Sequence, residues 1–119
     1  MKLAILLAFL LNNAFTPPPP IMAWNLVHNR DGIKISYDIY SCHGAPMLFW
    51  KMENSSGQNK FIRVKGTIVE GNYSQAIAFS VELTTNGLEG NCNQAIMPSS
   101  PCISLIHTFV NPQISLTVN

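Results

Sequence analysis

The feature that most constrains the fold is a period-two alternation of apolar and polar side chains, which runs through the chain from Trp24 onward. Successive side chains of a β-strand point to opposite faces, so this pattern indicates strands with one buried and one solvated face. Two other segments, 47–53 and 103–110, are apolar on both faces and predict more central strands. The alternating segments are 33–39, 62–68, 77–83 and 114–118, with Gly66 weakening the second of them or marking a bulge.

Turn-forming residues fall between these segments. Asp31-Gly32 predicts a hairpin between 24–28 and the strand that begins at Ile33. The result is about seven strands, which predicts an all-β protein with a single antiparallel, immunoglobulin-like β-sandwich over residues 24–119. A small barrel is the alternative. The aromatic side chains expected in or beside the core are Trp24, Trp50 and Phe79. The other turn signals are at 54–58, 70–72, 86–87 and 111–112.

Residues 1–14 have the features of a secretory signal peptide. Lys2 and the amino terminus are positive, and the apolar run at 3–11 is too short to span about 30 Å of hydrocarbon as a helix. We expect a signal-peptide helix that is cleaved after Ala14, or alternatively after Ala23, followed by a stiff Pro-rich spacer at 15–23. The protein is then secreted or periplasmic. It would contact a membrane only through an uncleaved signal sequence.

The composition of the chain limits the classes of partner that it is expected to bind. The formal net charge is +1 and charged residues make up 11% of the chain, so no basic cluster predicts a nucleic acid or an anionic membrane as partner. The mature chain of roughly 100 residues is one domain, and a domain of this size benefits from a covalent staple. Two sequons, at Asn54 and Asn72, would be glycosylated only in a eukaryotic secretory route.

Three cysteines are an odd number for an exported protein. A Cys42–Cys92 bridge would close a loop of about 50 residues and contribute roughly 4 kcal/mol, whereas Cys92–Cys102 would pin only the loop at 86–101. We prefer the first pairing, and the sequence leaves the second open. In the first case the Cys102 thiol is either buried or pairs with another molecule.

No motif in the chain predicts catalysis. The three histidines, His28, His43 and His107, lack a nucleophile with an orienting third group, and the acidic residues scatter to strand ends and outer faces. We therefore predict a protein that is not an enzyme and that needs no cofactor. A metal site made of Cys42, His43 and Cys92 is disfavoured, because it lacks CxxC or HxxxH spacing and exported thiols oxidise.

The segment 24–44, WNLVHNRDGIKISYDIYSCHG, resembles the opening of a group of short exported bacterial proteins of unknown function. These proteins start with a tryptophan, carry an Asp-Gly hairpin and continue into a Tyr-rich strand that ends at Cys-x-Gly. The segment 48–54, LFWKMEN, is similar to their next strand, and Gly90-Asn91-Cys92 resembles their Gly-x-Cys turn. The resemblance implies a β-sandwich, a Cys42–Cys92 disulfide and no particular activity. The chain departs from the group at Cys102 and at 93–101.

Three classes of function fit these observations. The first is a protein-binding or envelope-associated interaction module of unknown partner, which presents loops or an edge strand. The second is a carbohydrate-binding module, which needs a row of exposed aromatic rings. The third is a structural subunit of a surface assembly. The residues expected on a binding surface are Tyr40, Phe49 and Tyr73, because Tyr40 and Phe49 fall on the outward phase of their strands.

Overall fold

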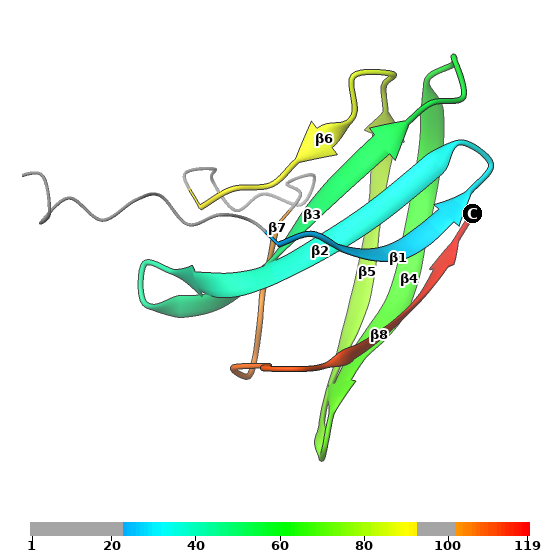
Figure 1. Ribbon diagram of the computed structural model, residues 1–119. Helices are drawn as coiled ribbons and strands as arrows, with labels where there is room; N and C mark the ends of the chain where they lie inside the picture. Colours follow the sequence, from blue (N-terminus) through cyan, green and yellow to red (C-terminus); the bar gives the residue numbers. More distant parts are fainter. Residues whose placement is uncertain (1–22, 93–101) are drawn as a thin grey trace, which may run out of the picture.

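The computed structural model describes residues 23–92 and 102–119, and this part of the chain consists of eight β-strands joined by turns and loops (Figure 1). Within it there is no helix long and apolar enough to cross a membrane. The predicted signal peptide, and the Pro-rich spacer apart from Ala23, lie outside the described residues. The strands are β1 (Asn25–Arg30), β2 (Ile33–Cys42), β3 (Ala45–Asn54), β4 (Lys60–Glu70), β5 (Tyr73–Leu83), β6 (Leu88–Glu89), β7 (Cys102–Ser104) and β8 (Gln113–Val118).

The strands form two sheets that pack face to face (Figure 1). The larger sheet has the order β1-β2-β3-β6, and β7 also pairs with β3. The smaller sheet has the order β5-β4-β8. Every pairing is antiparallel. The predicted all-β sandwich is therefore confirmed, with the short β6 as a strand that the sequence pattern did not indicate.

The predicted hairpin at Asp31-Gly32 is present between β1 and β2. Asp31 has a φ of 56° and Gly32 a φ of 78°, the left-handed conformations that a two-residue turn needs to match the twist of its strands. Gly66 marks no bulge, since the register of β4 continues through it on both sides. It marks a close approach: a Cβ there would lie 2.0 Å from the carbonyl oxygen of Ser115.

The main core lies between the two sheets. Trp50 is buried at its centre, and Phe79 packs beside it with the ring centroids 5.5 Å apart, as the sequence predicted for both. Asn54 is also buried, and its side-chain amide donates hydrogen bonds to the carbonyl oxygens of Gln58 and Leu83. The largest side chains that are almost completely buried are Trp50, Phe49, Ile35, Leu48, Met52, Ile68, Leu83 and Val64.

A second apolar cluster covers the outer face of the larger sheet. In the β2–β3 ladder Ile39 lies opposite Leu48, which belongs to the main core. Met47 and Phe49 flank Leu48 in sequence, so they point to the other face. There they pack with three cysteines and with the half-buried Trp24 and Tyr40. The members of this outer cluster are Cys42, Met47, Phe49 and Cys102, with Trp24, Tyr40 and Cys92 against them.

The predicted central strand at 103–110 is wrong for most of its length, because β7 covers only its first two residues. Beyond them Leu105 and Phe109 turn into the main core, whereas Ile106 and Val110 point to solvent. A segment that is apolar on two sides is thus a loop that crosses one end of the sandwich from β7 to β8 (Figure 1).

Candidate interaction surface

The outer cluster holds the disulfide. Cys42 is bonded to Cys92, and their Cα atoms lie 5.5 Å apart, a normal separation for a disulfide. The preferred pairing, which the family resemblance also implied, is confirmed. Cys102 lies buried in the same cluster with its sulfur outside the disulfide. A disulfide of this kind fits a protein that matures in an oxidising compartment.

Two of the three residues predicted on a binding surface instead pack within this cluster. Phe49 is 0% exposed, so its place on a binding surface is a wrong prediction. Its strand phase is outward as predicted, but the outer cluster covers that face. Tyr40 is half-buried and stacks on the Phe49 ring at a centroid distance of 4.2 Å. Burial raises the pKa of the Tyr40 phenol. Both aromatic rings therefore contribute to the packing of the outer cluster.

Cys42, His43 and Cys92 also bring three potential metal ligands within 4.8 Å of one another. The two sulfurs are bonded to each other, so neither is a thiolate that could bind a metal. His43 is exposed and lies in the turn between β2 and β3. With the disulfide formed, this group offers one ligand, and the described residues contain no other group of this kind.

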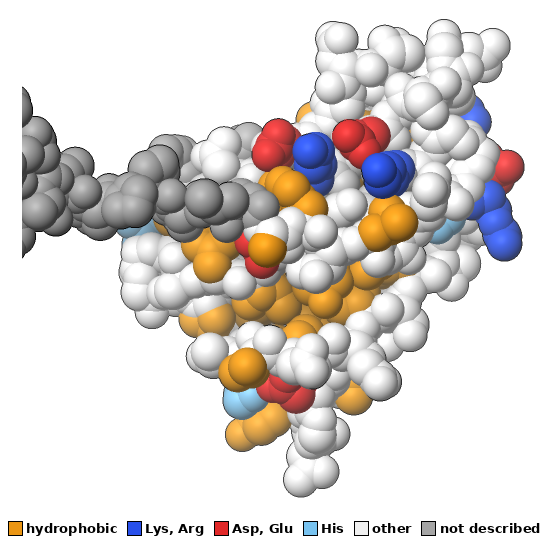
Figure 2. All heavy atoms as spheres, in the orientation of Figure 1, with side chains coloured by type: hydrophobic (Ala, Val, Ile, Leu, Met, Phe, Trp, Pro, Cys, Tyr) orange, Lys and Arg blue, Asp and Glu red, His pale blue; other side chains and the backbone are white. Residues whose placement is uncertain are grey.

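The third predicted residue, Tyr73, is exposed and belongs to an apolar surface at one end of the sandwich. The exposed fractions are 38% for Val69, 50% for Tyr73, 70% for Ile106 and 86% for Val110. We call these four residues the apolar tip. Val69 and Tyr73 come from the β4–β5 hairpin, and Ile106 and Val110 come from the loop between β7 and β8. In Figure 2 the hydrophobic side chains at the end with the β4–β5 turn surround a histidine and an acidic side chain.

Rings join the two parts of the tip. The imidazole of His107 stacks on the Tyr73 ring at a centroid distance of 3.6 Å and an interplanar angle of 7°. The ring of Phe109, which is buried in the main core, lies at 89° to the imidazole with the ring centroids 5.1 Å apart. His107 therefore packs between a surface tyrosine and a core phenylalanine. The stack ties the loop to the hairpin.

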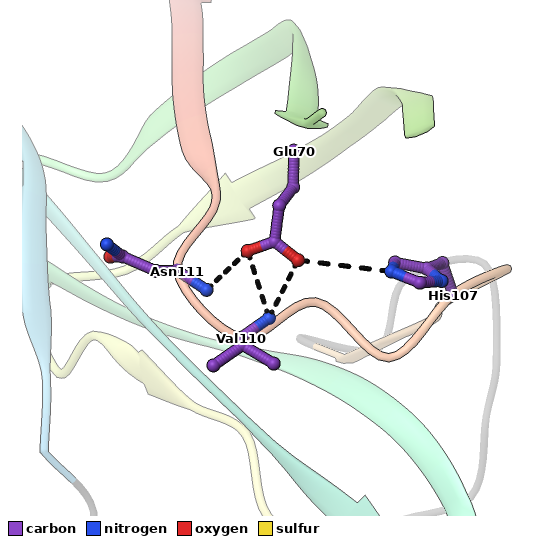
Figure 3. A network of polar contacts seen from close by, with 4 residues as sticks. All are labelled: Glu70, His107, Val110 and Asn111. Carbon is purple, nitrogen blue, oxygen red and sulfur yellow. Dashed lines mark hydrogen bonds and ion pairs between the residues drawn. The ribbon is translucent and has the colours of Figure 1, made fainter. Parts of the chain in front are cut away.

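Glu70 fixes the far end of the loop (Figure 3). Its carboxylate accepts hydrogen bonds from the backbone N–H groups of Val110, at 3.1 Å, and Asn111. His107 Nε2 lies 3.9 Å from the same carboxylate and forms an ion pair with it when protonated. The N–H donors of Asn111 and Val110 stabilise the charged form, so the pKa of Glu70 is lowered. Both carboxylate oxygens are thereby engaged in holding the chain.

Gln75 fixes the near end of the loop. Its side-chain amide donates to the carbonyl oxygen of Ser104 and accepts from the N–H of Ile106, at 3.0 and 2.9 Å. Together, Gln75 and Glu70 take up N–H groups that a neighbouring strand would otherwise bond. This competition is the physical reason why 105–110 is a loop. The sequence analysis missed Ile106, Val110, Glu70 and Gln75 as site residues. The one available signal was the 105/109 and 106/110 spacing, which is not that of a strand.

A groove of about 800 Å³ opens between β1 and β8 on another side of the molecule. Val27, Leu116 and Val118 line it and are only half-buried, although they pack against the main core. Arg30 and Lys60 contribute positive charge to its wall. Figure 2 shows hydrophobic side chains in the hollow between the layer with β1 and the layer with β8. Solvent therefore reaches the core from this side, which makes the groove a second surface open to contact.

Comparisons of the chain with protein-family models, with curated proteins and with solved structures give no match.

Proposed function

We propose that this protein is an exported, non-enzymatic module that binds another protein or an envelope component through the apolar tip. The observation that supports this most is that the side chains of the tip are exposed while the backbone that carries them is held by hydrogen bonds. Ile106 and Val110 are the most exposed large apolar side chains among the described residues, and their backbone is held by Glu70 and Gln75. Exposed apolar side chains that gather in one patch favour a contact surface over a solvated loop.

A fixed loop also favours binding energetically. A flexible segment loses conformational freedom when it binds, and each ordered side chain then lowers the affinity. The tip has already lost this freedom in the unbound protein, because both ends of the loop are bonded and His107 is stacked on Tyr73. A partner that covers Ile106 and Val110 would gain the burial of their surface without ordering the loop.

Export completes the proposal. The apolar run at 3–11 fits a signal sequence, and the Cys42–Cys92 disulfide fits an oxidising compartment. We infer that the protein is secreted or periplasmic and that it needs no cofactor. Within the sandwich class, the immunoglobulin-like assignment is likewise our proposal.

A carbohydrate-binding module is the alternative, and fewer observations support it. Such a site needs a row of exposed rings that can stack on sugars. Of the three aromatic residues predicted on a binding surface, Phe49 is buried, Tyr40 is stacked on Phe49, and the Tyr73 ring already stacks on His107. A soluble-polysaccharide titration followed by tryptophan and tyrosine fluorescence separates the two proposals.

Photo-cross-linking in the native host tests the protein-binding proposal. A benzophenone side chain replaces Val110 at the tip, and in a control protein it replaces Thr85, which is exposed in the turn beyond the other end of β5. We expect an adduct of defined higher mass from position 110 and none from position 85. Peptide mass mapping then identifies the cross-linked molecule.

A second substitution makes this result specific. Ile106→Ser removes an exposed side chain but keeps the backbone bond to Gln75, so the adduct should fall at least about tenfold if the tip is the contact surface. Phe61→Ser removes a side chain of similar exposure at the start of β4 and should leave the adduct unchanged. Equal adducts from positions 85 and 110, or no adduct from either, would rule the proposal out.

A further inference from the structure

Apart from the short β6 and β7, the described part of the sandwich has three edge strands, β1, β5 and β8. They differ in how they are protected from pairing with another strand. Natural edges are blunted by bulges, charges, prolines or short length. The register of β1 is broken between Leu26 and His28, and β1 ends on the charged Arg30. The edge of β8 is six residues long and follows Pro112 directly. The edges formed by β1 and β8 are therefore both protected against pairing with another strand.

The β5 edge has only one of these devices, a single charged side chain near its C-terminal end. β5 pairs with β4 in an unbroken register over eleven residues, contains no proline and has Glu82 as its one charged residue. Within the described part of the chain, β5 has no other strand partner. Its first three residues lie beside the loop at the tip, through Tyr73 and Gln75. The stretch 76–82 is left as an open edge of backbone N–H and carbonyl groups, and Leu83 beyond it accepts the hydrogen bond from Asn54.

We propose that this edge binds a second copy of the chain, antiparallel and about a two-fold axis, so that the two smaller sheets become one six-stranded sheet. The strand is self-complementary. In the register centred on Phe79, Ala78 lies opposite Ser80 of the other copy, and Ile77 lies opposite Val81 on the core side. Directly opposite residues share a face in an antiparallel pair, so small side chains meet outside and apolar ones meet inside.

Charge also favours a second copy. Glu82, the one charged side chain of the strand, lies opposite Ala76 in this register, so no like charges meet across the two-fold axis. Phe79 and Val81, half-buried in the monomer, gain cover from the partner strand. Seven residues from each copy, 76–82, form a small contact, so we expect a dissociation constant in the range of about 1–100 µM. This interface is separate from the apolar tip and does not depend on the proposed function.

Sedimentation velocity of the exported protein between 1 µM and 1 mM, roughly spanning the expected dissociation constant, tests the inference with two matched lysine variants. Ala78→Lys places a charge on the open edge. Thr117→Lys places the same charge on β8, and both positions lie directly opposite Lys65 in the sheet. We expect a concentration-dependent dimer for the wild-type protein and for Thr117→Lys, and a dimer weakened at least tenfold for Ala78→Lys.

Three outcomes would overturn it: a wild-type monomer up to 1 mM, an equal effect of both lysines, or weakening by Thr117→Lys alone, which would assign the contact to β8. Hydrogen exchange of the wild-type protein covers the case in which Ala78→Lys fails to fold. Amides in 76–82 should exchange more slowly at about 500 µM than at about 5 µM, while those of β8 stay unchanged. Val110→Ser, which removes a tip side chain, should leave the dimer intact and so separates this interface from the tip.

Discussion

Removal of the Cys42–Cys92 disulfide is expected to lower the unfolding free energy of this domain by a large fraction. The two cysteines are 50 residues apart, and a link across a loop of that length lowers the entropy of the unfolded chain. The loop-entropy relation gives about 4 kcal/mol at 25 °C. A domain of this size has a total unfolding free energy of about 5–15 kcal/mol, so the loss is a large fraction of the whole.

Urea unfolding of the Cys42→Ala/Cys92→Ala variant, followed by tryptophan fluorescence, measures this loss. With a urea dependence of about 1 kcal/mol/M, the unfolding midpoint should fall by about 4 M. Cys102→Ala is the control, because it removes a buried sulfur from the same outer cluster and keeps the disulfide. It should cost about 1 kcal/mol. If the double variant loses less than about 1 kcal/mol of unfolding free energy, the entropy argument is refuted. Packing in the outer cluster, and not the disulfide, would then account for the position of the chain near residue 92.

Three further predictions concern the smaller sheet and its surroundings. Gly66→Ala should destabilise the protein by about 2 kcal/mol in thermal unfolding, since the new Cβ would lie 2.0 Å from the Ser115 carbonyl oxygen and β8 must move away. The lowered pKa of Glu70 predicts a contribution to stability that is fully present above its unfolded pKa, near 4.3, and is lost as the pH falls through the folded value. The melting temperature of Glu70→Gln should therefore change less between pH 6 and pH 3 than that of the wild type, and an equal change would contradict the assignment. Asn54→Ala should cost about 2 kcal/mol, because it removes the side-chain donor from the buried Leu83 carbonyl oxygen and the hydrogen bond to the Gln58 carbonyl oxygen. Asn72→Ala in the exposed β4–β5 turn should lie within about 0.5 kcal/mol of wild type.

The strands of two hairpins, β1–β2 and β4–β5, follow from the sequence because their determinants are local. Ile33, Ile35 and the turn at Asp31-Gly32 specify both a strand phase and a reversal within ten residues. The same holds for the β4–β5 pair, where Ile62 and Val64 alternate with charged side chains. The alternation of side chains and the choice of turn residues act locally and do not depend on distant parts of the chain. The strands and turns that they predict are therefore found in the folded protein.

The two features that define the candidate site are set by contacts distant in sequence, and a pattern does not contain them. Phe49 faces outward as its phase requires, yet chain about 50 residues away covers it. The segment around Ile106 is apolar enough for a strand, but Glu70 and Gln75, more than thirty residues earlier, take its backbone donors. The strand phase was thus predictable, and the exposure of each face was not.

The covalent topology of the outer cluster has a consequence for biogenesis. In a chain that is exported from its N-terminus, Cys42 leaves the membrane first, Cys92 second, and Cys102 ten residues after that. The native bond joins the first two to emerge, so an oxidase that links cysteines in order of appearance makes the correct disulfide at once. If the chain is exported as proposed, Cys102 emerges after Cys42 and Cys92 are able to pair, and this connectivity requires no isomerisation step.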